Sequence, residues 1–65
     1  MCESNVYVTD DGGETLLMEN VSWMEFDGDA IHMRDIDGAE RTVHGRLKCA
    51  DLVQHRLVLE QVQSD

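Results

Sequence analysis

Residues 21–34 read VSWMEFDGDAIHMR, and their pattern sets the class of fold. At the centre, residues 27–29 are Asp-Gly-Asp; glycine readily takes the positive φ of a tight hairpin turn, and aspartate tolerates it. After the turn, Ile31 and Met33 alternate with polar residues, as expected of a strand with one buried face. The stretch therefore predicts a β-hairpin that directs its apolar side chains into a core.

The same alternation of short apolar runs and acidic-glycine turns continues in both directions. Further turns fall at residues 10–13, Asp-Asp-Gly-Gly, and at residues 35–38, Asp-Ile-Asp-Gly. Turn signals at this spacing indicate an all-β meander, and closing six or seven short antiparallel strands into a small barrel removes unpaired edges. Gly45 lies between two runs and predicts a bend or a bulge. The expected strands are residues 6–9, 15–18, 21–26, 31–34, 41–44, 46–49 and 57–60.

Residues 47–60 fit two descriptions. Leu52, Arg56 and Leu59 have the spacing of one helix face. The alternation of apolar and polar residues is cleaner on both sides of residues 51–54, so we favour two strands around a tight turn there.

The length of 65 residues predicts one domain over residues 1–65. A chain this short buries only about 60% of its unfolded surface and usually needs a disulfide, a metal or oligomerisation. Cys2 and Cys49 permit one disulfide, but no signal peptide or membrane-spanning run is seen, which indicates a cytoplasmic protein with reduced thiols. Oligomerisation is then the expected reinforcement, and a homodimer is its commonest form.

The formal net charge is −9, from 14 acidic and 5 basic residues. This field repels phosphate backbones, and the basic residues are scattered singly among acids instead of forming a basic stripe. We therefore expect no nucleic acid as a partner, and the lack of a membrane-spanning run leads us to expect no membrane either. The same field raises the local concentration of cations, although an acidic surface also serves solubility.

Cys2 is the residue with the clearest chemistry, because its thiol lies beside the terminal amine. A thiolate with a nitrogen ligand suits nickel(II), copper or zinc better than magnesium or calcium. If Met1 is removed, the amine and thiolate of Cys2 itself form a compact chelate; if Met1 stays, backbone amides must contribute more. The alternative is that Cys2 is only a small residue at a frayed end.

Enzyme and calcium signatures are missing from the sequence. Residues 12–13, Gly-Gly, fit a hairpin turn better than a phosphate loop, and no serine has a positioned base. Asp35 and Asp37 precede Gly38 as in the start of an EF-hand loop, but the remaining ligands of that loop are absent. We expect these aspartates to form a turn.

Several other residues have expected structural roles. His32 and His44 occupy outward strand positions, and His55 flanks the final turn, where a hydrogen bond to the backbone is usual; none forms a short metal-ligand pair. Cys49 shares the face of Leu47 and should be an inert core thiol. We expect Trp23 in the core in preference to a subunit interface. We expect Val58 and Val62 on an outer face of the last strand that could pack against a second copy.

Taken in order along the chain, several short motifs resemble the CooT family, the small nickel-binding accessory proteins of carbon monoxide dehydrogenase maturation. The resemblance covers nearly the whole length, and the ordered set with Cys directly after Met1 is its most specific part. The motifs are Met1-Cys2, Val6-Tyr7-Val8, Met18-Glu19-Asn20-Val21, Gly28-Asp29, Gly45-Arg46-Leu47, Asp51-Leu52 and His55-Arg56-Leu57-Val58-Leu59-Glu60.

The resemblance implies an SH3-like barrel, a homodimer, and one nickel(II) bound by Cys2 of both chains. It also implies a metallochaperone-like role towards a nickel enzyme, with carbon monoxide dehydrogenase as one client. Ile36-Asp37-Gly38 lacks the aromatic residue usual in the family at this turn, a departure that concerns packing. Two other readings stay open: a metal-free SH3-like protein-interaction module and, against the charge, an RNA-binding small barrel.

Overall fold

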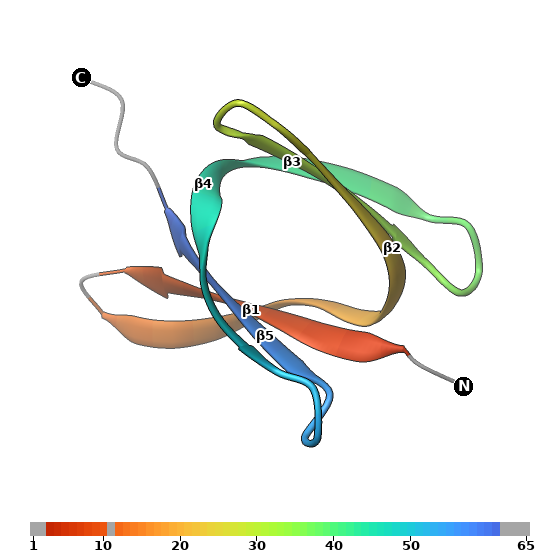
Figure 1. The fold of residues 1–65 in the computed structure, drawn as a ribbon, viewed down its shortest axis with the longest axis horizontal. Coiled ribbons are helices and arrows are strands. Elements are labelled where there is room, and N and C mark those ends of the chain that lie inside the picture. The colour runs from red at the N-terminus through yellow and green to blue at the C-terminus, as the bar shows by residue number, and fades with distance from the viewer. Residues whose placement is uncertain (1–2, 11, 62–65) are drawn as a thin grey trace.

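The structure is a computed structural model that describes residues 3–10 and 12–61, which form five β-strands. Each strand pairs with the next, and the last returns to the first, so the described strands form a closed barrel (Figure 1). The predicted all-β class is confirmed. The strands are β1 (Ser4–Asp10), β2 (Gly13–Asp27), β3 (Ala30–Asp35), β4 (Glu40–Asp51) and β5 (Arg56–Gln61).

The predicted number of strands, six or seven, is wrong, because two pairs of predicted runs join into single long strands. β2 contains the runs at residues 15–18 and 21–26, and β4 contains those at 41–44 and 46–49. The expectation of purely antiparallel pairing is also wrong for one pair. A chain that runs up and down through an odd number of strands ends in the direction in which it began, and β5 accordingly pairs parallel to β1.

β2 bends so that its two halves belong to different pairs. Its first half pairs with β1 as far as Val21, and from Val21 onward it pairs with β3. Asn20 precedes this junction with a positive φ of 57°, a conformation that asparagine tolerates better than most residues. The bend lets one strand contribute to both sides of the barrel.

β4 bends at Gly45, as the sequence predicts. The strand pairs with β3 up to His44 and with β5 from Gly45 onward. A side chain at Gly45 would clash with the carbonyl oxygen of Glu60, so the backbones of β4 and β5 approach closely here because glycine has no Cβ. The amide of Gly45 also donates a hydrogen bond of 2.8 Å to the carbonyl oxygen of Asp29, which ties the β2–β3 hairpin to the bend.

The core lies inside the barrel and draws residues from all five strands. Ile31 and Met33 are fully enclosed, which confirms the alternation predicted for this run. Ten apolar residues make up this cluster: Val6, Val21, Ile31, Met33 and Leu59 are buried, and Leu17, Met18, Met24, Val43 and Leu57 are packed against them.

The predicted turns are confirmed at residues 27–29 and near residues 51–54. Gly28 has φ of 59° in the hairpin between β2 and β3, where a positive φ favours glycine. Between β4 and β5 the chain makes a turn at residues 52–55, not a helix, and the Asp51 carboxylate accepts a hydrogen bond from the Gln54 amide. Among the residues that the structure describes, no helix is long and apolar enough to cross a membrane.

Candidate functional site

Cys2, the predicted metal ligand, lies outside the described residues. The structure does show where the chain that carries it enters the barrel, because β1 begins at Ser4. Ser4 pairs with Val21 of β2, and Asn5 pairs with Arg56 of β5. The surroundings of Ser4 and Asn5 therefore define the part of the barrel nearest to Cys2 along the chain.

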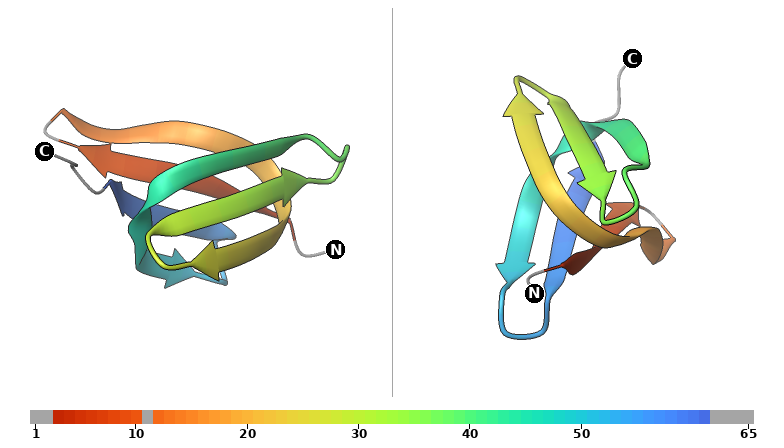
Figure 2. Two further views of the ribbon diagram at one scale, coloured as in Figure 1. Left: turned by 90° about the horizontal axis from the view of Figure 1, so that it is seen from above. Right: turned by 90° about the vertical axis from the view of Figure 1, so that its right-hand side faces the viewer.

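Asn5 links the turn at residues 52–55 to Asn20 of β2 beside the start of β1. Its amide donates to the carbonyl oxygen of His55 at 2.9 Å, and its side-chain oxygen accepts from the amide of Asn20 at 3.2 Å. The carbonyl oxygen of Asn20 in turn accepts from the amide of Ile36 at 3.0 Å. We call this region the N-terminal end of the barrel, formed by residues 4–5, Asn20 and the turns at residues 36–39 and 52–55. Figures 1 and 2 show that the β2–β3 turn lies at the opposite end.

Apolar side chains project from both turns at this end. Leu52 is 74% exposed and Val53 is 85% exposed in the β4–β5 turn, while Ile36 is 51% exposed in the β3–β4 turn. Turns usually carry glycine, proline or short polar residues at such positions. In the β3–β4 turn, the Asp35 carboxylate accepts hydrogen bonds from the amides of Asp37 and Ala39, both at 2.9 Å. These bonds confirm the turn-forming role expected for Asp35.

Cys49 is exposed, and its predicted place in the core is wrong. The register shifts between Leu47 and Cys49, so Leu47 faces Leu59 while Cys49 faces Val58. Leu59 and Val58 are neighbours in β5 and point to opposite faces, which separates Leu47 from Cys49 as well. A bulge of this kind breaks the period-two rule on which the prediction rested, and Leu47, taken as the core neighbour, is itself 44% exposed.

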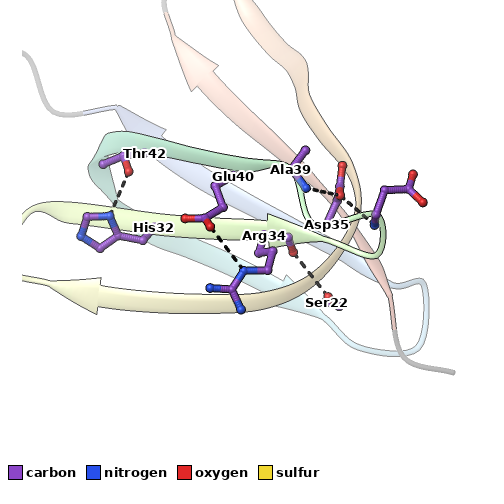
Figure 3. A network of polar contacts seen from close by, with 8 residues as sticks. Ser22, His32, Arg34, Asp35, Ala39, Glu40 and Thr42 are labelled. Carbon is purple, nitrogen blue, oxygen red and sulfur yellow. Dashed lines mark hydrogen bonds and ion pairs between the residues drawn. The ribbon is translucent and has the colours of Figure 1, made fainter.

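The three histidines lie on different elements. His32 is half-buried and shares a hydrogen bond of 2.9 Å with Thr42 on the neighbouring strand (Figure 3), whereas His44 is exposed. His55 is exposed and accepts the hydrogen bond from Asn5 through its backbone carbonyl. Across residues 3–10 and 12–61, no group of three or more His, Cys, Asp or Glu side chains is arranged to hold a metal ion.

Trp23 is 38% exposed, so its predicted place in the core is wrong. The register of β2 shifts between Val21 and Trp23, and Trp23 pairs with Arg34 on the outer face of β3. The guanidinium carbon of Arg34 lies 4.6 Å from the centroid of the Trp23 ring, and its Nε lies 3.8 Å from Glu40 (Figure 3). The tryptophan is thus part of a cation–π stack on the surface.

Val58 is only 6% exposed, so the predicted outer-face docking role is wrong for this residue; Val62 lies outside the described residues. The parallel pairing of β5 with β1 sets Tyr7 beside Val58. Arg56 lies over the Tyr7 ring, 4.3 Å from the ring centroid, and also forms an ion pair with Glu14. Val58 therefore lies on a face that side chains of the same chain cover, not on an open outer face.

A small pocket opens at the end of the barrel opposite Ser4. It has a volume of about 120 Å³ and mixes apolar with charged side chains, including Arg41, which donates a hydrogen bond of 3.3 Å to the carbonyl oxygen of Leu17. Its residues come from four strands, so no single stretch of sequence predicts it. The lining residues are Val8, Leu17, Arg41, Val43, His44, Gly45, Leu59, Glu60 and Gln61.

The strands around one apolar core define a small closed β-barrel protein. The family model described as CO dehydrogenase accessory protein CooT matches residues 1–60, a range that includes Cys2, and the chain belongs to this family.

Two similar proteins extend this finding. An uncharacterized protein of Methanothermobacter thermautotrophicus is 42% identical over 60 residues, which cover 92% of this chain and 89% of the relative. The solved structure titled "Crystal structure of putative CooT from Carboxydothermus hydrogenoformans" superposes with a TM-score of 0.87 at 24% identity, covering 95% of this chain and 100% of that one. At this identity the second comparison supports the fold.

Proposed function

We propose that the protein is a nickel(II)-binding accessory protein, metallochaperone-like in its action, which binds one metal ion per homodimer through Cys2 of each chain. The observation that carries the proposal is the CooT family match, because it extends to residue 1 and so includes Cys2. The description of that family names CO dehydrogenase, which makes this enzyme the first candidate client, and the proposal extends to other nickel enzymes. The proposal includes an SH3-like class for the barrel and a cytoplasmic location.

Two thiolates supplied by two chains suit nickel(II). Soft sulfur ligands together with amine or amide nitrogens make the square-planar set that this ion accepts. Because a two-fold axis relates the same residue in both subunits, one cysteine position suffices to supply a matched pair of ligands. Ligands at the start of a chain, in place of a buried cage of side chains, favour exchange of the metal with a client over storage.

Proton competition follows from the same chemistry. A free thiol has a pKa of about 8.5 and an α-amine a pKa of about 7.7–8.0, so both are mostly protonated at neutral pH. Each must lose its proton before it binds the metal. Nickel binding should therefore release protons and tighten as the pH rises.

The exposed stack of Trp23 and Arg34 favours a second candidate function. Aromatic and arginine side chains are enriched at the centres of protein interfaces. A metal-free SH3-like interaction module that binds a protein partner through this face is the alternative. Partner binding that persists unchanged in Cys2→Ser would support it.

Native mass spectrometry with added nickel(II) tests the proposal, and the chain supplies its own matched control. Cys2→Ser should abolish the complex of one nickel with two chains, because it removes the proposed thiolates. Cys49→Ser removes the other cysteine, which is exposed on β4, and should leave that stoichiometry unchanged. Stoichiometric nickel retained by Cys2→Ser, or lost in Cys49→Ser, would contradict the assignment.

A further inference from the structure

The pocket at the end of the barrel opposite Ser4 lies where two strands approach without pairing. Leu17 belongs to the half of β2 that pairs with β1, and Arg41 belongs to the half of β4 that pairs with β3. Among the described strands, β2 and β4 are not neighbours in the sheet. The pocket of about 120 Å³ opens between these two halves and reaches the core, because the buried Leu59 forms part of its lining.

The apolar part of the lining is continuous with the core. Leu59 is 1% exposed, and Leu17 and Val43 are packed against the buried cluster. Apolar cavities stay dry and take up apolar molecules; one of about 150 Å³ holds benzene. By that measure this pocket has room for an apolar group of about four to six carbons.

Arg41 brings a positive charge to this apolar lining. It pairs directly with Met33, which is 1% exposed, and side chains that lie directly opposite in a sheet project from the same face. The Arg41 side chain therefore starts from the face that lines the core. One guanidinium nitrogen donates to the carbonyl oxygen of Leu17 at 3.3 Å. A guanidinium has five N–H donors, so further donors remain for a ligand.

The electrostatic role of Arg41 differs from that of the other arginines. Each of those lies beside a glutamate, in the pairs Arg34–Glu40, Arg46–Glu60 and Arg56–Glu14. Within the part of the chain that the structure describes, no carboxylate lies within ion-pair distance of Arg41, which is held by a main-chain carbonyl. Glu60, the acid in the pocket lining, is the partner of Arg46. The charge of Arg41 is therefore left for an anion from outside the chain.

We propose that this pocket binds a small monocarboxylic acid in its ionised form. The apolar body enters beside Val8, Val43 and Leu59, and the carboxylate pairs with Arg41, whose planar fork matches two carboxylate oxygens. A second carboxylate would have to lie among apolar side chains without a partner, in a chain whose net charge is −9. The site therefore selects monocarboxylates over dicarboxylates. It is separate from the proposed metal site, which the other end of the chain carries.

NMR titration of the full nitrogen-labelled chain tests the proposal, with isovalerate, cyclopentanecarboxylate and benzoate as probes. We expect saturable shifts at the amide of Gly45, which lines the pocket, and none at the amide of Asn5 near the start of β1. Isovaleramide keeps the apolar body without the charge, and acetate and succinate keep the charge without that body. Each should bind at least about tenfold more weakly than isovalerate, since a hydrogen bond to a charged group or a buried apolar side group contributes this much.

Three variants separate the two halves of the site. Arg41→Met keeps the length of the side chain and should weaken isovalerate binding at least about tenfold, because it removes the charged donors. Arg34→Met is the matched control, since Arg34 lies on the outer face beside Trp23, and it should leave the affinity within about twofold. Val8→Phe enlarges a half-buried lining residue and should abolish binding by filling the pocket. Circular dichroism confirms that each variant is folded.

Several results would overturn the inference. They are the lack of a saturable shift with all three probes at tens of millimolar, shifts that centre away from the pocket, equal binding of isovaleramide and isovalerate, or a folded Arg41→Met or Val8→Phe that binds like the wild type. Cys2→Ser separates this site from the metal function: it should lose nickel and keep the acid. Acid binding without nickel binding would retain this pocket and reject the metal function, and the converse would do the reverse.

Discussion

Replacing Gly45 with alanine should force β4 and β5 apart at the bend of β4. The new Cβ would clash with the carbonyl oxygen of Glu60, and it would lie 3.4 Å from the Cα of Gln61. These are backbone atoms, so no side chain can rotate away to relieve the contact. The amide of Gly45 is also bonded to the carbonyl oxygen of Asp29, which restricts movement on the other side.

The expected cost is about 1–3 kcal/mol, the usual range for inserting atoms into a packed site. Reduced freedom of the unfolded chain would offset roughly 0.4–1 kcal/mol of this. A 65-residue domain has a total stability of only about 3–10 kcal/mol, so the change is a large fraction of it. For a domain of this size, each kcal/mol lowers the melting temperature by roughly 4–8 °C.

Urea unfolding followed by the fluorescence of Trp23, the only tryptophan, measures this effect. Gly12→Ala is the matched control, because the nearest atom to its Cβ is the flexible Asp10 carboxylate at 3.3 Å. It should change the stability by less than about 0.5 kcal/mol. Gly45→Ala with a stability equal to that of Gly12→Ala would refute the close approach of β4 and β5.

Two further predictions concern the metal and the outer face. Nickel affinity should rise between about pH 6 and pH 8, because the proposed Cys2 thiolates form by losing protons. Calorimetry in two buffers of different ionisation enthalpy should detect the released protons. A pH-independent affinity would contradict thiolate ligation. Arg56→Met should lower the stability by about 1 kcal/mol, because it removes the stack on Tyr7 and the half-exposed ion pair with Glu14. Urea midpoints at low and high salt check this, since the wild type should lose more stability in salt than the variant does; equal losses would argue against the ion pair.

Local sequence signals predicted the features that depend on neighbouring residues. The hairpin around Gly28 and the burial of Ile31 and Met33 follow from turn chemistry and a period of two. The bend at Gly45 follows from the absence of a side chain between two apolar runs. The prediction of a turn, not a helix, between β4 and β5 is confirmed, and it rests on the alternation of apolar and polar residues on both sides.

The errors arise where a strand bulges or where its neighbour is distant in sequence. Cys49 and Trp23 each follow a register shift, and a shift of one residue moves the following side chains to the other face. Val58 is covered because closure of the barrel brings β1 alongside β5, with Tyr7 next to it. No periodicity within residues 57–60 contains that information.

Residue order alone sufficed for the all-β class and for most turns, because both depend on short-range geometry. Cys2 stays a predicted ligand, on the chemistry of one side chain. Tertiary structure decided which parts of the chain surround the start of β1. Asn5, Asn20, Ile36 and His55 are far apart in sequence and are joined by hydrogen bonds at one end of the barrel. Of these contacts, the bond between Asn5 and His55 depends on the closed sheet, because only closure brings the first and last strands together.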